Sequence, residues 1–566
     1  MKRFLFDRFL FFTLIFYGAL FLISARLFYL QIPLGSFFSK KSNNNFTRFQ
    51  TIFPLRGNIT DTSGILLATN RPVINVIWQG TGNRTLTEHQ EILLKRIENL
   101  SQKGFDAAFI KKIKQAERYK TKIVVIGDLS PTSLASLLEQ FSMSENLVIE
   151  NNFRRYYPYG HLASHLLGYI NQIDQKVFGR MGLESLLQGD LQGKDGQRML
   201  IINSVGTNIF QQETLTPLKG DVVCTTLDVR LQLLAEEFFP KEFLGTLLVM
   251  DPRTGALRVI LSRPDFDPSM FLKTVKSDEW HNFQQGQPLL NRAFNACYPP
   301  ASIFKLITMS AALEHKIIEQ DDTIMCRGSL RLGSRPYHCA NRHGHGMLSV
   351  KEALSKSCNI LFFYIGKHLS IDVLADYAQR FGLGSKTDVL FPERAGLVPS
   401  IAWKRQTKGE PWWRGDTLSC AIGQSYLLTT PIQIARMIGA IFEGRLVRPR
   451  ILEEEPISYQ FLNIKQETLD FLQESMKLAA DEGTGQLVGR IKDIKAYTKT
   501  GTAETTTNKS TPEHAWFVAY FQYKAEPLVL VILVENVGAA KVATRIAKNY
   551  LNGYKKLMDE KLLDFS

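Results

Sequence analysis

The chain has 566 residues, of which 45% are hydrophobic and 22% charged, a composition that is typical of globular protein and excludes a largely disordered chain. A chain of this length has room for two to four domains. The formal net charge of +14 suits work near anionic lipids or acidic wall polymers, although a solvated basic surface is the plainer interpretation, and no nucleic-acid motif is present.

The first predicted element is a membrane-spanning helix over residues 9–30. Residues 9–25 carry no charged side chain, and residues 27–30 extend the apolar run beyond Arg26. A cleaved signal peptide is the alternative, but no convincing small-residue cleavage site follows the run. We therefore expect a single uncleaved anchor in the cytoplasmic (inner) membrane. Residues 1–8 would form a cytoplasmic tail, and the chain from about residue 35 onward would lie outside the cytoplasm, in the periplasm.

A mixed helix and strand segment follows the anchor. The turn at residues 61–64, Asp-Thr-Ser-Gly, predicts two short strands within residues 56–70. Helical patterns with charged faces and one further strand come next, the helices at 88–103, 107–118 and 131–141 and the strand at 122–126.

Two histidines in this segment have the spacing of a metal pair on a helix. His161 and His165 are four residues apart. The neighbouring Pro158 and Gly160 disfavour the helix that such a pair needs, so we do not expect metal there. A domain boundary is expected near residues 220–226.

The second half of the chain predicts an antiparallel sheet covered by helices. A helix at 228–239 precedes a hairpin over 245–260, and many helices follow between residues 302 and 442. Strands return at 495–500, 514–523 and 528–535, before a C-terminal helix. Helices placed between an early hairpin and three late strands predict an α+β fold.

The first chemical motif is Ser302-Ile303-Phe304-Lys305, the only S-x-x-K in the chain. Pro299 and Pro300 suit a helix start, so Ser302 is expected in the first turn, with Lys305 on the same face and within reach of its hydroxyl. The surrounding residues are apolar, and burial would favour a neutral amine that can act as a base. The alternative is a lysine that snorkels out of a core helix beside a capping serine.

Two further motifs favour the catalytic interpretation. In Ser357-Cys358-Asn359, an extended loop would point Ser357 and Asn359 into a cleft and Cys358 to the opposite side. Lys499-Thr500-Gly501 is the only K-T-G, and it lies on a predicted edge strand where glycine permits a peptide to approach closely.

Together these motifs closely resemble those of the penicilloyl serine transferases, which comprise the penicillin-binding proteins and the serine β-lactamases. The resemblance implies that Ser302 attacks the D-Ala-D-Ala carbonyl of a peptidoglycan stem peptide and that Lys305 takes its proton. Ser357 would relay the proton to the leaving D-alanine, and Asn359 would hold the acyl amide. Lys499 would supply positive charge, and Thr500, Gly501 and Thr502 would bind the substrate, with the Ser302 and Thr502 amides as oxyanion hole.

The resemblance extends over nearly the whole chain. Segments such as Arg155-Tyr156-Tyr157-Pro158 and Gly182-Leu183-Glu184 are similar to the pedestal of class B penicillin-binding proteins. It implies a penicilloyl-serine-transferase fold at 226–566, preceded by an elongated α+β pedestal at 45–225. Ala301 and Ser425 stand where the family commonly has glycine, which makes the loop geometry there uncertain.

Four residues form a candidate zinc site, Cys326, Cys339, His345 and Cys358, with His338 and His343 as spare candidates. The spacing alone is weak evidence, and a Cys326–Cys339 disulfide or free thiols would be the default. The site gains weight because some elongation-type members, penicillin-binding protein 2, hold zinc with the middle residue of S-x-N. A structural zinc would tie the Ser357 loop in place, and no cofactor is expected for the chemistry.

Three functions remain open. The first is a membrane-anchored D,D-transpeptidase, for which the family implies a SEDS-family glycan polymerase and elongation-complex proteins as partners. The second is a β-lactamase or β-lactam sensor, which would not need the pedestal. The third is a scaffold with a silent site, against which the three intact motifs argue.

Overall fold

The computed structural model describes residues 2–101, 104–129, 135, 146–173, 176–203, 208–273, 277–504 and 511–563. The chain forms two compact units. Unit 1 comprises residues 1–57 and 192–221, and unit 2 comprises residues 58–191 and 222–566.

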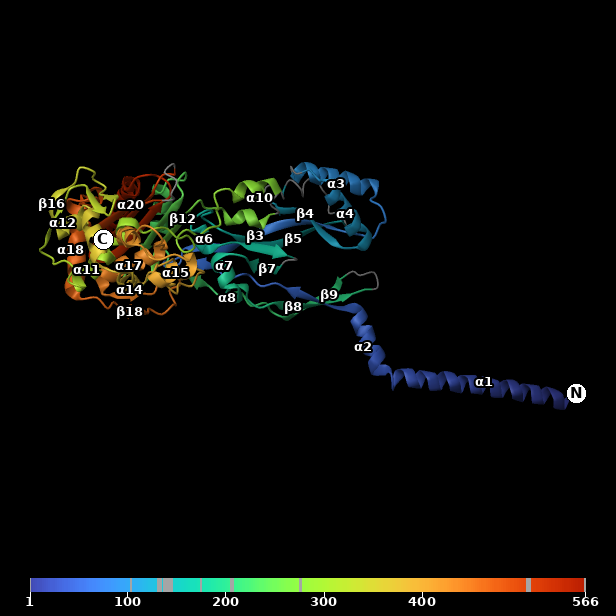
Figure 1. Ribbon diagram of the computed structural model, residues 1–566. Coiled ribbons are helices and arrows are strands. Elements are labelled where there is room, and N and C mark those ends of the chain that lie inside the picture. The colour runs from blue at the N-terminus through green and yellow to red at the C-terminus, as the bar shows by residue number, and fades with distance from the viewer. Residues whose placement is uncertain are drawn as a thin grey trace. The chain divides into compact units, whose positions relative to one another are not determined.

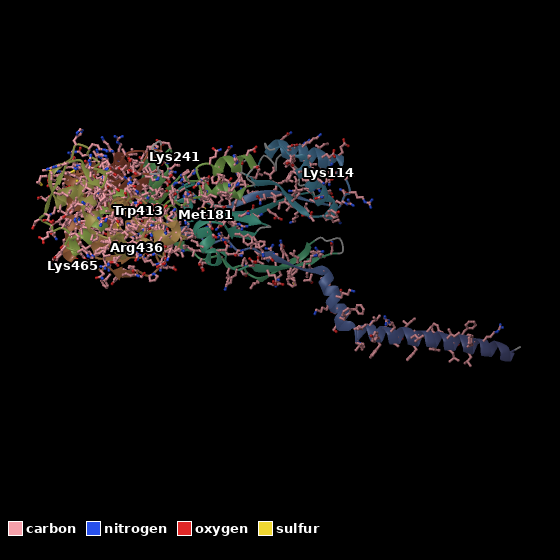
Figure 2. The ribbon with its side chains drawn as sticks, viewed as in Figure 1. Lys114, Met181, Lys241, Trp413, Arg436 and Lys465 are labelled. Atoms are coloured by element: carbon pink, nitrogen blue, oxygen red, sulfur yellow. The ribbon has the colours of Figure 1, made fainter. Side chains whose placement is uncertain are left out.

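Unit 1 begins with the predicted apolar helix. Helix α1 (Lys2–Gln31) is followed by a turn and by α2 (Gly35–Phe46), as Figure 1 shows. From Arg8 to Gln31 the helix is long and apolar enough to cross a membrane, and Figure 2 shows its side chains projecting on both sides of the helix. An antiparallel sheet completes the unit in the order β1 (Thr47–Ile52), β8 (Gly196–Ile202), β9 (Asn208–Leu215).

Unit 2 starts with a sheet on which two helices pack. Strand β3 (Leu66–Gln79) pairs with three antiparallel neighbours, namely β2 (Ile59–Thr60), β4 (Lys122–Leu129) and β5 (Leu147–Tyr156), and β2 also pairs in parallel with β10 (Val223–Cys224). The predicted turn joins β2 to β3, and Asp61 Oδ1 accepts the Ser63 and Ile65 amides there. The helices are α3 (Glu88–Ser101) and α4 (Ala107–Tyr119), while the predicted helix at 131–141 lies outside the described residues.

Short helices and a hairpin follow β5, and the two histidines in this segment have different partners. His165, in α6 (Ser164–Leu167), is buried, and its Nε2 lies 2.7 Å from the Pro288 carbonyl oxygen. His161 lies 3.6 Å from Asp265. The hairpin of β6 (Ile170–Ile173) and β7 (Lys176–Gly179), α7 (Gly182–Leu186) and α8 (Gln188–Gln192) come next.

The predicted antiparallel sheet has five strands. Their order is β12 (Leu257–Arg263), β11 (Gly245–Met250), β21 (Glu526–Val534), β20 (His514–Tyr523), β19 (Lys495–Ala503), so β19 is an edge strand, as predicted. The side chains of β20 alternate between two apolar clusters. Phe517 and Ala519 belong to the cluster with α9 (Val229–Phe238) and α20 (Ala540–Leu563), and Trp516 and Val518 belong to the cluster with the other helices.

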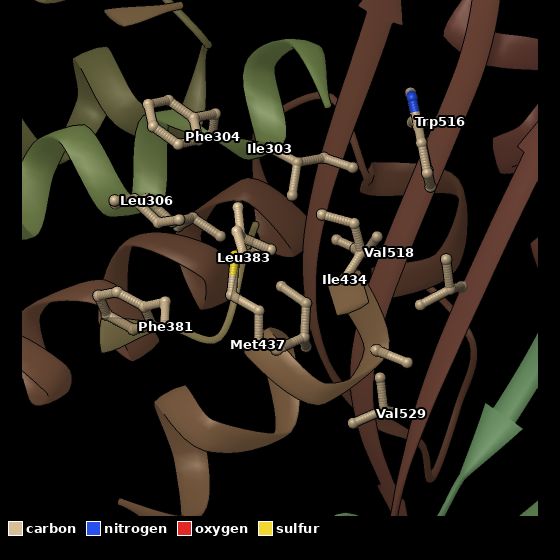
Figure 3. Close-up of a cluster of buried hydrophobic side chains, with 14 of the residues drawn as sticks. Ile303, Phe304, Leu306, Phe381, Leu383, Ile434, Met437, Trp516, Val518 and Val529 are labelled. Atoms are coloured by element: carbon tan, nitrogen blue, oxygen red, sulfur yellow. The ribbon is translucent and has the colours of Figure 1, made fainter. Parts of the chain in front are cut away.

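The second cluster holds the helix that follows the serine motif. Figure 3 shows Ile303 on the side of the strands that carry Trp516 and Val518, Phe304 among the helices on the other side, and Met437 of α17 (Pro431–Glu443) below Ile303. The remaining helices between residues 305 and 481 are α11 (Lys305–Glu314), α12 (Val350–Ser355), α13 (Asn359–His368), α14 (Ile371–Arg380), α15 (Ile401–Lys408), α16 (Arg414–Ala421) and α18 (Gln466–Asp481). The short helix α19 (Gln486–Gly489) contributes Val488 to the cluster with α9 and α20.

Short hairpins interrupt the helices, which the sequence did not predict. Between α11 and α12, β13 (Thr323–Cys326) pairs with β16 (Gly346–Ser349), and β14 (Ser329–Leu332) pairs with β15 (Arg335–His338). Between α17 and α18, β17 (Arg445–Val447) pairs with β18 (Tyr459–Phe461).

Candidate active site

Ser302 lies in a 3₁₀ turn rather than in the α-helix proper. The turn spans Ala301–Ile303, and helix α11 begins at Lys305. Ala301 has a φ of 51°, in the left-handed region, and its amide donates to the Gly423 carbonyl oxygen at 2.9 Å. Ser302 is half-buried, and its hydroxyl makes no hydrogen bond to any residue that the structure describes. The hydroxyl is therefore open to a substrate.

Lys305 is a fully buried amine that contacts the second motif. Its Nζ lies 2.8 Å from the Ser357 carbonyl oxygen, 3.1 Å from Ser357 Oγ and 2.7 Å from Asn359 Oδ1. A neutral amine has two N–H donors and one lone pair. The carbonyl and amide oxygens can accept both donors, which leaves the lone pair for a hydroxyl.

The second motif forms a joint between two helices, so the prediction of an extended loop there is wrong. Helix α12 ends at Ser355, Ser357 has a φ of 57°, and Asn359 is already the first residue of α13. Ser357 and Asn359 nevertheless both contact Lys305. The Cys358 side chain lies instead among the cysteines described below.

The third motif, on edge strand β19, also contacts Ser357. Lys499 Nζ lies 3.1 Å from Ser357 Oγ, so both lysines contact one hydroxyl. Thr500 Oγ1 lies 2.6 Å from Thr484 Oγ1, a partner that sequence reasoning missed although glycines flank Thr484 on both sides. If Thr484 donates to Thr500, the Thr500 proton is left for a substrate carboxylate. Gly501 packs against the serine turn, since a Cβ on it would lie 3.4 Å from both Ala301 Cβ and Pro300 O.

Burial lowers the pKa of both lysines. It lowers the pKa of Lys305 to about 7, and the thiols of Cys358 and Cys339 oppose this shift. Burial and the neighbouring Lys305 lower the pKa of Lys499 well below its usual value. Because one hydroxyl separates the two amines, protonation of one disfavours protonation of the other. The pair can therefore hold an unprotonated amine near neutral pH.

The segment Gly423-Gln424-Ser425 connects the serine turn to the third motif through hydrogen bonds. The Gly423 carbonyl accepts the Ala301 amide, and the Gln424 side chain donates to the Thr502 carbonyl oxygen at 3.1 Å. Gly423 has a φ of 75°, and Ser425 one of 70°. Ala301 and Ser425 therefore both adopt the left-handed conformation that explains why glycine is common at these positions.

Replacing Gly423 with alanine should displace the serine turn. A Cβ there would lie 2.0 Å from the Ala301 carbonyl oxygen, so the turn must move, and we expect destabilisation of more than about 2 kcal/mol and slower acylation by penicillin. Gly444→Ala is the matched control: its φ is 66°, but a Cβ meets nothing within 4 Å, so it should cost only about 1–2 kcal/mol. Thermal unfolding and labelling rates measure both effects. Equal effects for the two variants would contradict this account.

The cysteine cluster lies directly behind the second motif. The ligand atoms of Cys326, Cys339, His345 and Cys358 all lie within 4.8 Å of one another. All six cysteines are free, so the structure has no Cys326–Cys339 disulfide. His338 and His343 are exposed and do not belong to the set, although the His338 carbonyl accepts the Asn359 side-chain amide at 3.1 Å. The cluster is thus linked to a residue that holds Lys305.

Two family models match the chain. The penicillin binding protein transpeptidase domain matches residues 245–552, and the penicillin-binding protein dimerisation domain matches residues 51–225. Among similar proteins are two named peptidoglycan D,D-transpeptidase MrdA. The one from Escherichia coli K12 is 27% identical over 93% of this chain and 90% of its own length. The one from Acinetobacter baumannii is 27% identical over 94% of this chain and 84% of its own length.

Solved structures of the same family are also similar. A Helicobacter pylori complex of penicillin-binding protein 2 (PBP2) with MreC has a TM-score of 0.77 at 28% identity, covering 90% of this chain and 99% of that one. A peptidoglycan synthase complex described as coordinating polymerization and crosslinking has a TM-score of 0.76 at 28% identity, covering 97% of this chain and 98% of that one. With the transpeptidase model alone matching more than half of its length, the chain belongs to the class B penicillin-binding proteins, in the PBP2 branch.

Proposed function

We infer that this protein is a serine-type peptidoglycan D,D-transpeptidase whose nucleophile is Ser302. One observation carries the assignment of residues: Lys305, Ser357, Asn359 and Lys499 meet through hydrogen bonds of 2.7–3.1 Å, beside the turn that presents a half-buried Ser302. Three motifs far apart in the chain thus supply a nucleophile, a buried amine and a connecting hydroxyl at one place.

The geometry supports an acyl transfer in two halves. Neutral Lys305 takes the proton of Ser302 as Oγ bonds to the carbonyl carbon between the two D-alanines. Lys305 passes this proton through Ser357 to the leaving nitrogen, the C–N bond breaks, and D-alanine departs. The amine of a second stem peptide then attacks the acyl-enzyme, gives its proton back along the same route and releases Ser302.

The third motif is proposed to bind the substrate. Lys499 and the hydroxyls of Thr500 and Thr502 would hold the substrate carboxylate, and Gly501 would leave room for its backbone along the edge strand. The amides of Ser302 and Thr502 would stabilise the oxyanion, where one donor is typically worth about 2.7–4 kcal/mol.

A penicillin that carries a fluorophore distinguishes the three candidate functions. A transpeptidase gives an adduct that persists for many turnover times, a β-lactamase releases hydrolysed penicillin rapidly, and a silent scaffold gives no adduct. We expect a persistent adduct, seen as one labelled band and as a matching gain in intact mass.

We also propose a location and partners. Helix α1 would be an uncleaved anchor in the cytoplasmic membrane, supported by its apolar span from Arg8 to Gln31, with the remaining chain outside the cytoplasm. The pedestal would cover residues 45–225 and the transpeptidase domain residues 226–566. By analogy with the first complex above, this chain would bind an MreC-type protein. The resemblance to the family adds a SEDS-family glycan polymerase and a role in cell elongation, and the second complex, which joins polymerization with crosslinking, supports a polymerase as partner.

We further propose a structural zinc ion at Cys326, Cys339, His345 and Cys358. A zinc with sulfur ligands at about 2.3 Å has neighbouring ligand atoms about 3.8 Å apart in a tetrahedron. The cluster fits, because His345 Nδ1 lies 3.5 Å from Cys326 Sγ and 3.6 Å from Cys339 Sγ, and Cys339 Sγ lies 4.0 Å from Cys358 Sγ. Bound zinc would fix the helix joint at Ser357 and take no part in the acyl transfer.

Metal analysis of the full chain in detergent tests the zinc proposal. We expect about one zinc per chain, and loss of most of it in Cys358→Ser, with a lower Tm and slower penicillin labelling, because structural zinc contributes directly to folding. Cys224→Ser, at a half-buried cysteine outside the cluster, should keep the metal. A metal-free parent with six titratable thiols would contradict the proposal. A parent with only four titratable thiols and one disulfide would contradict it as well.

A further inference from the structure

A cavity of about 550 Å³ lies between the β6–β7 hairpin and the segment around α10 (Ser277–Gln284), and none of its lining residues belongs to the three catalytic motifs. Its volume is in the usual range of 300–1,000 Å³ for ligand sites. The residues that line it are Tyr169, Asn171, Gln172, Arg180, Phe271, Leu272, Lys273 and Trp280.

The apolar part of the cavity is a stack of aromatic rings. Tyr169 and Phe271 stack with centroids 3.7 Å apart and planes 17° apart, and Trp280 meets Phe271 edge-on at 6.3 Å. Trp280 is itself backed by Phe283 at 5.6 Å. Each lining ring contacts another ring, and because aromatic side chains have few rotatable bonds, a flat apolar face of a ligand can pack on this wall at little cost in side-chain entropy.

The polar part of the cavity is cationic and rich in amides. Arg180 and Lys273 are exposed, and neither forms an ion pair within the described part of the chain. Asn171 and Gln172 add exposed side-chain amides that both donate and accept hydrogen bonds. The lining residues include these two cations and no carboxylate, a set that suits an anionic group of a ligand.

From this combination we propose that the cavity binds a strand of acidic amino-sugar polymer, the glycan of peptidoglycan itself. The apolar face of a sugar ring packs on the Tyr169, Phe271 and Trp280 wall, acetamido groups pair with the two amides, and the carboxylates of the strand meet Arg180 and Lys273. The proposal rests on the transpeptidase assignment, since such a site would hold the polymer whose peptides the cleft joins.

Binding of peptide-free glycan tests the site separately from catalysis. The probe is a set of short glycan strands from which an amidase has removed the peptides, leaving the lactyl carboxylates. The full chain in detergent is first acylated with penicillin, so that the cleft is blocked, and Trp fluorescence and sedimentation report binding. We expect the acylated parent to bind, and Trp280→Ala to weaken binding at least tenfold.

Further variants test whether the charged side chains contribute to glycan binding, and whether loss of an exposed ring elsewhere on the protein affects it. Arg180→Gln and Lys273→Gln should each weaken binding severalfold and reduce its salt dependence. Phe461→Ala removes an 81% exposed ring elsewhere and should bind as the parent does. All variants should keep the parental rate of penicillin acylation, which shows that they are folded.

The outcomes distinguish the two proposals. Normal acylation with no glycan binding by the parent, or with binding unchanged in Trp280→Ala and Arg180→Gln, overturns the glycan site and leaves the transpeptidase standing. Binding that disappears once the cleft is acylated overturns it as well. A parent that is never acylated overturns the transpeptidase assignment instead.

Discussion

The Ser302→Ala variant is expected to give no covalent adduct with penicillin, whereas the parent gains one penicillin mass. The bond to the drug is expected to form at Ser302 Oγ, because Ser302 lies in the turn that Gly423 holds, three residues before the buried Lys305. Removing the oxygen therefore removes the acyl-enzyme altogether, and cross-linking with it. Intact-mass spectrometry after a long incubation measures the loss.

Ser310→Ala is the matched control for this variant. Ser310 lies on helix α11, which follows the serine turn, is fully buried, and donates to the Leu306 carbonyl oxygen at 2.9 Å. It should be acylated at the parental rate. An adduct that persists in Ser302→Ala would place the nucleophile elsewhere and contradict the assignment.

The second large effect is expected for Lys305→Arg. Arginine keeps a positive charge but cannot give up its proton at physiological pH, so it cannot act as a base. General-base catalysis is typically worth about 10²–10⁴ in rate, and we expect the acylation rate constant to fall by about 10³. Stopped-flow or timed labelling with a fluorescent penicillin measures it.

A second replacement separates the missing base from a disturbed fold. Lys305→Met removes the amine with a side chain of similar length and should lose a comparable factor, although it leaves the Ser357 carbonyl and Asn359 Oδ1 without this donor. Both variants should unfold cooperatively with a Tm within several degrees of the parent. If Lys305→Arg is acylated at the parental rate, residue 305 supplies a positive charge and not a lone pair, which would contradict its role as a base.

The sequence predicted which residues meet at the site better than it predicted their backbone conformation. The three motifs indicated that Ser302, Lys305, Ser357 and Lys499 share one cleft, because their residue types and order are specific. The extended loop expected at Ser357 is instead a joint between two helices with a left-handed residue. Local patterns favour common backbone regions, and only tertiary contacts, such as those of Lys305, stabilise this one.

Other features depended on contacts that no local pattern encodes. Thr484 bonds to Thr500, which is 16 residues away in the sequence, and Gln424 bonds to Thr502, 78 residues away. The hairpins that bring Cys326, Cys339 and His345 behind Cys358 are only four residues per strand, too short for a clear alternation. The aromatic cavity likewise combines residues from segments about 100 positions apart.

The central claim is that buried Lys305 is unprotonated when it activates Ser302, and the pH dependence of acylation tests it most directly. Below its pKa of about 7 the amine is an ammonium without a lone pair, so the rate constant for benzylpenicillin should rise with pH through about 7 and then level off. Burial already lowers the pKa of His514, so His514→Gln should keep the same midpoint. A rate constant that is flat or falls between pH 5.5 and 8.5 would contradict the account.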